Sequence, residues 1–176
     1  DGCLTFVIGE NGMDLAQIFG LPPTRIIKTG NWLGPLLVAA AENGVKKLLL
    51  FGYHGKLIKL SGGIFHTHHH LADGRLETLT TLAVREGIDI DLIELISKST
   101  SVENALLSLE ETNPEVVPLV WGRMAKEIEI QSLKYVNRYL SSSMDIGSVL
   151  FDRKRQIRWA GCKGLKQINS LGLILK

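Results

Sequence analysis

The segment Leu4-Thr5-Phe6-Val7-Ile8-Gly9-Glu10-Asn11-Gly12 decides the fold class of this chain. Its first five residues form an apolar run rich in β-formers, which is typical of a buried strand, and its glycines indicate a tight loop. Residues 13–19 then follow a helical pattern, which Pro22-Pro23 ends. A strand that runs through a short loop into a helix begins a crossover between parallel strands.

The same alternation continues along the chain. It predicts further strands over 25–28, 46–52 and 148–152, and a hairpin partner for the last of them over 156–160. It predicts helices over 35–42 and 70–85, and a helix from about 101 to 109 that Ser101 caps. Two more helical segments are predicted over 115–121 and 124–140. Right-handed crossovers then favour an α/β, Rossmann-like, three-layer domain over residues 1–152, with a mainly parallel sheet of about four strands. Residues 153–176, which hold seven Lys/Arg and no acid, are expected as a basic hairpin and tail.

Composition narrows the class of protein. A chain of 176 residues that is 45% hydrophobic and 22% charged is typical of a globular domain. Its apolar stretches are shorter than the roughly 20 residues of a membrane span, and it has no secretory signal pattern. The two cysteines do not form a disulfide framework, so a cytoplasmic location is expected. No nucleic-acid-binding motif accompanies the basic end, so neither a nucleic acid nor a membrane is an expected partner.

All five histidines lie between His54 and His70, within a Gly- and Lys-rich segment read as a loop over 53–70. His66 and His68 alternate as two metal ligands would, but no third ligand stands at a familiar spacing, so no protein-bound metal is predicted. Nearby cations indicate recognition of carboxylates or phosphates instead. A solvated polar loop is the remaining interpretation.

Three further patterns are candidates for a functional role. Asp73 and Glu77 stand one helical turn apart, where they could act as acid and base or orient a histidine, or could simply favour a helix N-terminus. The segment Gly9–Gly12 lacks the full GxGxxG fingerprint and is a weak signal for a nucleotide. Gly30-Asn31 opens a helix, either as a second polar rim or as an N-cap.

Four blocks in the first half of the chain resemble the cobalt-precorrin-5B C1-methyltransferase family, CbiD. They are Thr29–Gly34 (TGNWLG), Leu49–Leu60 (LLFGYHGKLIKL), Gly63–His68 (GIFHTH) and Ala72–Glu77 (ADGRLE). Their order and spacing match the family from about residue 4 to 82, and the resemblance weakens toward residue 140. His69 and Gly74 depart from the residues usual in the family.

The resemblance implies an activity and a place for this chain in a longer protein. The family transfers a methyl group from S-adenosyl-L-methionine to C1 of cobalt-precorrin-5B, giving cobalt-precorrin-6A in anaerobic cobalamin biosynthesis. Its members are about twice this length, so the chain is expected to be the C-terminal half and to partner an N-terminal domain absent from it. The expected sheet order is 2-1-3-4. The cobalt belongs to the tetrapyrrole substrate.

Combining the resemblance with the residue chemistry predicts three groups of site residues. Either His66 or His68 accepts a proton and is oriented by Asp73 or Glu77. The adenosyl cofactor lies near Gly9, Asn11, Gly12, Gly30 and Asn31. Contacts with the acidic substrate are expected from His54, Lys56, Lys59 and Arg75. Two alternatives are a non-catalytic Rossmann-like module that binds an anion or corrinoid, and a His-dependent metal hydrolase; self-association into a homo-oligomer is left open.

Overall fold

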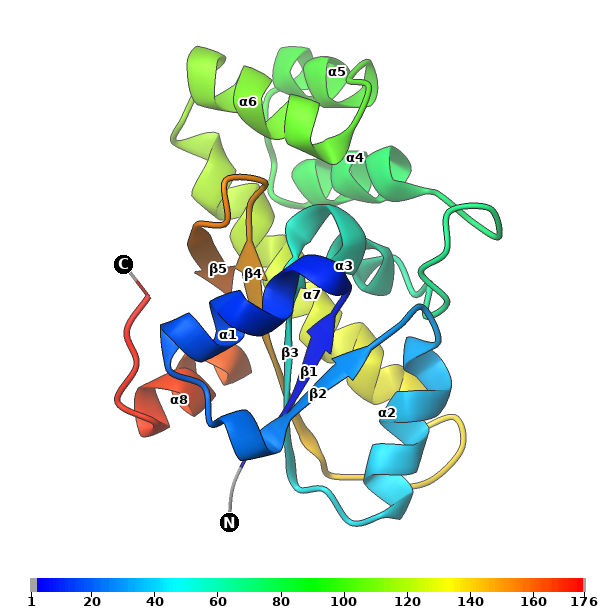
Figure 1. Ribbon diagram of the computed structural model, residues 1–176. Helices are drawn as coiled ribbons and strands as arrows, with labels where there is room; N and C mark the ends of the chain where they lie inside the picture. Colours follow the sequence, from blue (N-terminus) through cyan, green and yellow to red (C-terminus); the bar gives the residue numbers. More distant parts are fainter. Residues whose placement is uncertain (1–2, 176) are drawn as a thin grey trace.

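A five-stranded sheet forms the centre of the computed structural model, which describes residues 3–175 (Figure 1). The strand order is β2-β1-β3-β4-β5, with β1 (Leu4–Ile8), β2 (Ile26–Thr29), β3 (Lys47–Tyr53), β4 (Asp145–Phe151) and β5 (Ile157–Ala160). The first four strands are parallel, which confirms the order 2-1-3-4. The hairpin partner predicted over 156–160 is confirmed as β5, which pairs antiparallel with β4 at the edge and raises the expected count of about four strands to five.

Helices cover both faces of the sheet, which explains why its central strands are apolar throughout. Successive side chains of a strand point to opposite faces. Val7 and Leu49 therefore pack in one cluster with Ile168, under α1 (Met13–Phe19) and α8 (Cys162–Ser170). Residues next to them, such as Phe6 and Leu50, pack in the larger cluster on the other face. That face carries α2 (Leu33–Glu42), α3 (His54–Ser61) and α7 (Val116–Val136).

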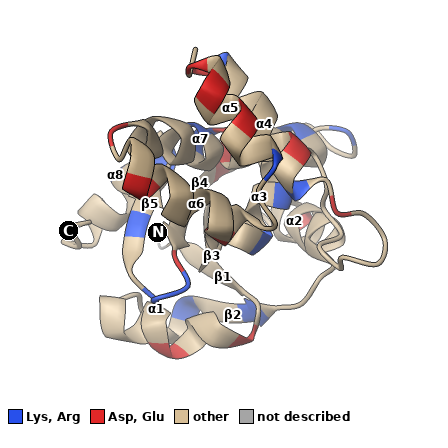
Figure 2. Ribbon diagram, turned by 90° about the horizontal axis from the view of Figure 1, so that it is seen from above, with Lys and Arg blue, Asp and Glu red and all other residues tan. Residues whose placement is uncertain are grey.

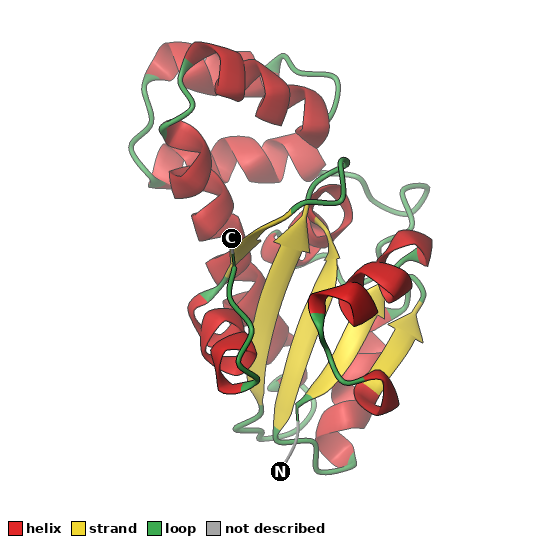
Figure 3. Ribbon diagram, turned by 60° about the vertical axis from the view of Figure 1, so that its left-hand side comes forward, coloured by secondary structure: helices red, strands yellow, loops and turns green. Residues whose placement is uncertain are grey.

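Three more helices form a group beyond the carboxyl ends of the strands (Figure 3). They are α4 (Arg75–Arg85), α5 (Ile90–Ser97) and α6 (Val102–Thr112). The predicted cap of α6 is confirmed, since the backbone N–H of Asn104 donates to Ser101 Oγ at 3.0 Å. This group places side chains of α6 over the edge of the sheet where parallel α/β proteins bind ligands.

The largest difference from the sequence-based prediction is α3, which occupies part of the expected loop over 53–70. Glycine and histidine are poor helix formers, so propensity alone argued against a helix. Every residue of α3 except Lys56 is buried, and this packing outweighs the propensity. Gly55 is required there, because a Cβ atom would lie 2.5 Å from the ring of Tyr53.

Two other helix predictions are corrected. The helix expected over 70–85 begins at Arg75, since Gly74 adopts a left-handed backbone conformation with φ of 61° just before it. Helix α5 was not anticipated. The two segments expected over 115–121 and 124–140 form one continuous helix, α7, whose buried residues continue on both sides of Gly122. Among residues 3–175, no helix combines the length and hydropathy needed to cross a membrane.

A buried carboxylate joins the C-terminal segment to the rest of the fold. Glu129, on α7, accepts hydrogen bonds from the backbone N–H groups of Ser148 (3.1 Å), Lys163 (3.1 Å) and Gly164 (2.8 Å). Burial raises the pKa of Glu129, while the three N–H donors oppose that shift. The carboxylate thus satisfies the N-terminus of α8 and fixes it against β4, so residues 153–175, expected as a hairpin and tail, supply β5 and α8.

Candidate functional site

Two adjoining clefts lie at the carboxyl ends of the parallel strands. We call the first the strand-end cleft; it measures about 690 Å³ and is lined by Ile8, Gly9, Glu10, Asn11, Tyr53, Lys56, Ser101, Glu103, Phe151, Asp152, Arg153 and Arg155. We call the second the basic cleft; it measures about 340 Å³ and is lined by Asn31, Tyr53, Gly55, Lys56, Lys59, Thr67, His68, His69 and Arg75. Tyr53 and Lys56 line both clefts. Ligands bound in the two clefts would therefore be neighbours.

The view onto this edge shows basic and acidic segments side by side (Figure 2). The turn between β4 and β5, which holds Arg153 and Arg155, lies against α1, where Arg155 pairs with Asp14 at 2.6 Å. Asp152, at the end of β4, accepts from the backbone N–H of Gln156 at 2.9 Å. Several charges at this edge are therefore already paired within the protein.

Lys59 is the most deeply buried cation of the basic cleft, with only 2% of the residue exposed. Its Nζ atom donates to the carbonyl oxygens of Thr67 (3.2 Å) and Ala72 (2.6 Å). No carboxylate of residues 3–175 lies within ion-pair distance of it. Burial lowers the pKa of Lys59. Since an ammonium group has three donors, one remains for an anion in the cleft.

Arg75 reaches the basic cleft together with a carboxylate partner. Its Nε and Nη2 atoms donate to the two oxygens of Asp73 at 2.6 and 3.0 Å, and this pair lowers the pKa of Asp73. Asp73 therefore orients Arg75 and not a histidine. Because α4 begins at Arg75, the predicted shared helix face of Asp73 and Glu77 is wrong, and Glu77 lines a separate groove with Ser61.

The histidines have different surroundings. His68 and His69 line the basic cleft. Desolvation, followed by the charges of the neighbouring histidines, lowers the pKa of His68. His66 lies outside the lining of both clefts, with its ring against Trp32 at a centroid distance of 4.4 Å. Within residues 3–175, no three His, Cys, Asp or Glu side chains are grouped as metal ligands would be.

The residues predicted to hold the cofactor are divided between different places. Gly9 and Asn11 line the strand-end cleft, and Gly9 has a φ of 92°, which favours glycine. Gly12 is buried, and a Cβ atom there would lie 2.7 Å from Val7, so it serves packing. Asn31 instead lines the basic cleft, where it accepts from Thr67 Oγ1 at 2.9 Å. Gly30 lines neither cleft.

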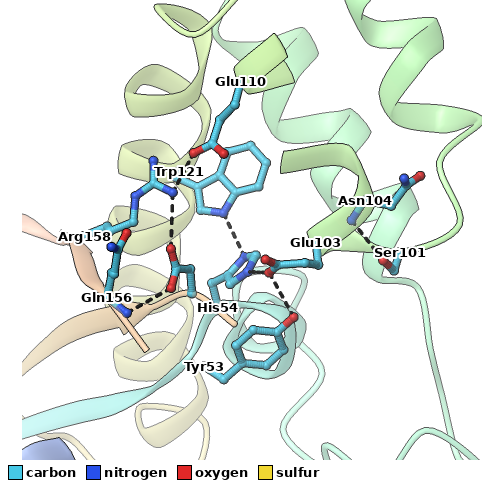
Figure 4. A network of polar contacts seen from close by, with 10 residues as sticks. Tyr53, His54, Ser101, Glu103, Asn104, Glu110, Trp121, Gln156 and Arg158 are labelled. Atoms are coloured by element: carbon cyan, nitrogen blue, oxygen red, sulfur yellow. Dashed lines mark hydrogen bonds and ion pairs between the residues drawn. The ribbon is translucent and has the colours of Figure 1, made fainter. Parts of the chain in front are cut away.

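A hydrogen-bonded chain of four side chains supports the strand-end cleft (Figure 4). Trp121 Nε1 donates to His54 Nδ1 at 2.9 Å, and His54 Nε2 lies 2.7 Å from Glu103 Oε2. The indole N–H is only a donor, so Nδ1 must accept, and the neutral ring carries its proton on Nε2. His54 therefore donates to Glu103, and the Tyr53 hydroxyl donates to the same oxygen at 3.2 Å.

The position of His54 does not fit the substrate contact predicted for it. The residue has no exposed surface, and both ring nitrogens are occupied within the protein. Burial lowers the pKa of His54 although Glu103 opposes that shift. Within the hydrogen-bonded chain of side chains, His54 holds Glu103, which comes from α6 and lines the strand-end cleft.

Sequence reasoning missed Glu103, Tyr53 and Asp152. No local pattern marks Glu103, since an acid in the first turn of a helix is ordinary. Tyr53 and Asp152 lie at the carboxyl ends of parallel strands, and the rule that ligands bind there could have identified both. Burial and the neighbouring Glu103 raise the pKa of Tyr53 to about 12, so its hydroxyl stays protonated and remains a donor.

The fold and clefts define an α/β domain with two adjoining clefts at the carboxyl edge of a mainly parallel sheet. The family described as CbiD, C-terminal domain, matches residues 66–162, which is more than half of the chain. The chain belongs to this family.

Curated relatives from Prochlorococcus marinus carry the name cobalt-precorrin-5B C(1)-methyltransferase. The chain is 84% identical to the protein of strain NATL2A over all 176 residues, and 59% identical over 175 residues to that of strain SARG. In each case it covers 46% of the relative, so the chain spans about half the length of the curated relatives it matches. No solved structure matches it at a significant level.

Proposed function

We propose that the full-length protein containing this chain methylates C1 of cobalt-precorrin-5B with S-adenosyl-L-methionine, and that this chain supplies neighbouring sites for both reactants. The names of the relatives support the reaction. The observation that carries the assignment to this half is the pair of clefts that share Tyr53 and Lys56. Two reactants held side by side need no further translational search, which is a large part of the barrier to a bimolecular step.

The basic cleft is the proposed site for the macrocycle. The corrinoid precursor carries several carboxylates, and charge-assisted hydrogen bonds from Lys or Arg bind such groups strongly. Lys56 and Lys59 have no carboxylate partner among residues 3–175, so their charges are available to a ligand. Arg75 uses one edge of its guanidinium for Asp73 and keeps its Nη1 group.

The strand-end cleft is the proposed site for the methyl donor. Its volume of about 690 Å³ lies in the range of about 300–1,000 Å³ that is usual for small-molecule sites. It offers both a carboxylate and cations, which fits a ligand with a zwitterionic amino-acid end. Gly9, Asn11, Lys56 and Glu103 would hold it. When bound, S-adenosyl-L-methionine supplies an electrophilic methyl group.

His68 is the proposed proton acceptor, because it lines the basic cleft and His66 lines neither cleft. Its lowered pKa keeps the imidazole neutral at physiological pH, as a base requires. Asp73 binds Arg75 and Glu77 lines a separate groove, so neither carboxylate is placed to orient the His68 ring. The role proposed for Asp73 is therefore to orient Arg75.

The test is product formation by the full-length protein. Cobalt-precorrin-5B and methyl-labelled S-adenosyl-L-methionine are incubated with it, and the corrinoid is analysed by mass spectrometry and NMR for label at C1. We expect one labelled methyl group per product. Tight binding of the corrinoid without any transfer would support the non-catalytic binding module instead. Stoichiometric zinc in the purified protein, with hydrolytic activity, would support the metal hydrolase.

A further inference from the structure

Glu103 has one carboxylate oxygen that the protein does not use. Oε2 accepts from His54 at 2.7 Å and from Tyr53 at 3.2 Å. Oε1 has no hydrogen-bond partner among residues 3–175. It is not fully buried, so a ligand can reach it. Since the residue lines the strand-end cleft, the free oxygen is available to a donor group on a ligand.

A cation stands in the same cleft without a partner of its own. Lys56 is half-buried, desolvation lowers its pKa, and no described carboxylate lies within ion-pair distance of its Nζ atom. A Cβ atom on Gly9 would lie 3.7 Å from that nitrogen, so Lys56 extends to the end of β1. Arg155 in the same cleft is already paired with Asp14, and Asp152 is bound by Gln156.

The unused charged groups of the strand-end cleft therefore include Glu103 Oε1 and the ammonium group of Lys56, with Arg153 as a second cation that has no ion pair among residues 3–175. We propose that Glu103 binds the α-ammonium group of the amino-acid end of S-adenosyl-L-methionine and that Lys56 binds its α-carboxylate. The inference rests on the proposed function. It implies that Glu103 makes the cleft bind ligands with this zwitterionic end more tightly than ligands that lack it.

His54 and Trp121 act as positioning residues for that contact. Trp121 fixes the tautomer of His54, and His54 then presents an N–H group that holds Glu103 Oε2. With one oxygen held by two donors, the carboxylate loses little rotational freedom when a ligand binds, and preorganisation of this kind increases affinity.

The experiment measures ligand affinity in the full-length protein by isothermal titration calorimetry. S-Adenosylhomocysteine and 5′-methylthioadenosine share the adenosine and the sulfur, but only the first has the amino-acid end. In a Glu103→Gln variant the two internal donors still need an acceptor, so the amide oxygen faces them and the NH₂ group faces the cleft. Affinity for S-adenosylhomocysteine should fall about 10- to 100-fold, as expected for a hydrogen bond between charged groups. Affinity for 5′-methylthioadenosine should not change.

Glu111→Gln is the matched control, because Glu111 is an exposed acid on the same helix and lines neither cleft. Circular dichroism and thermal unfolding check that each variant is folded. An equal loss for both ligands, or no loss for either, in Glu103→Gln would overturn the inference while the proposed function stands. Failure of the wild-type protein to bind either ligand would overturn both the inference and the proposed cofactor site.

Discussion

Trp121 Nε1 and His54 Nδ1 lie 2.9 Å apart in the interior, and this contact determines which nitrogen of His54 carries a proton. The two residues are 67 positions apart, on α7 and at the start of α3. Packing between these helices thus sets the chemistry of a side chain that neither helix would specify alone. Glu103, on α6, depends on that tautomer for the donor it receives.

A Trp121→Phe substitution should destabilise the fold and release His54. It removes the indole donor and leaves Nδ1 buried without a partner, which costs about 1–3 kcal/mol in the free energy of unfolding, in addition to lost packing. Urea unfolding gives the stability. ¹⁵N NMR of the imidazole should still show the Nε2–H form, because Glu103 accepts that proton, but the Nδ1 resonance should shift because Nδ1 has lost its donor. An unchanged Nδ1 resonance would contradict the contact between Trp121 and His54.

The buried His54 should make stability fall as the pH falls below about 6.5. The unfolded imidazole has a pKa of about 6.5, and burial lowers the pKa in the folded state, so between these values only the unfolded chain binds the proton. The free energy of unfolding then decreases by at most about 1.4 kcal/mol per pH unit and is fully recovered above the unfolded pKa.

Unfolding by urea between pH 5 and 8 measures this dependence. Comparison with His54→Gln separates it from the exposed histidines, because Gln can accept from Trp121 and donate to Glu103 without titrating. The variant should have a shallower slope below pH 6.5. Identical slopes in both proteins would assign the pH dependence to other groups.

Glu129 should contribute strongly to stability. Glu129→Ala leaves the backbone N–H groups of Ser148, Lys163 and Gly164 without their acceptor, which we expect to cost about 3 kcal/mol or more. Glu129→Gln keeps the oxygen that Ser148 and Gly164 share, so its cost should be smaller. Glu111→Ala is the exposed control. Equal stability of the two Glu129 variants would contradict this ranking.

Lys59 should support both a loop and the substrate. Lys59→Met removes the donor to Thr67 and Ala72, so stability should decrease by about 1–3 kcal/mol. Affinity of the full-length protein for cobalt-precorrin-5B should decrease by about tenfold or more, while affinity for S-adenosylhomocysteine is retained. Fluorescence or absorbance titration measures the two affinities. Lys46→Met, an exposed change at the amino end of β3, is the control.

Much of the fold follows from local pattern, and less of the site does. The strands could be predicted because an apolar run followed by a helix allows few topologies, whereas their order was expected from the family resemblance. Helix α3 could not, since its poor formers are stabilised by burial against α7, a contact distant in sequence. Lys56, Lys59 and Arg75 were predicted in one site because they are close in the chain. Glu103 was missed because only the placement of α6 brings it to the cleft.

The shared wall of the two clefts provides the most direct test of adjoining reactant sites, since Lys56 lines both clefts. In the full-length protein, Lys56→Met and Lys59→Met are each titrated with S-adenosylhomocysteine and with cobalt-precorrin-5B. We expect Lys56→Met to weaken binding of both ligands, whereas Lys59→Met should weaken binding of the corrinoid alone. Unchanged affinity of Lys56→Met for either ligand would contradict adjoining reactant sites in this half of the protein.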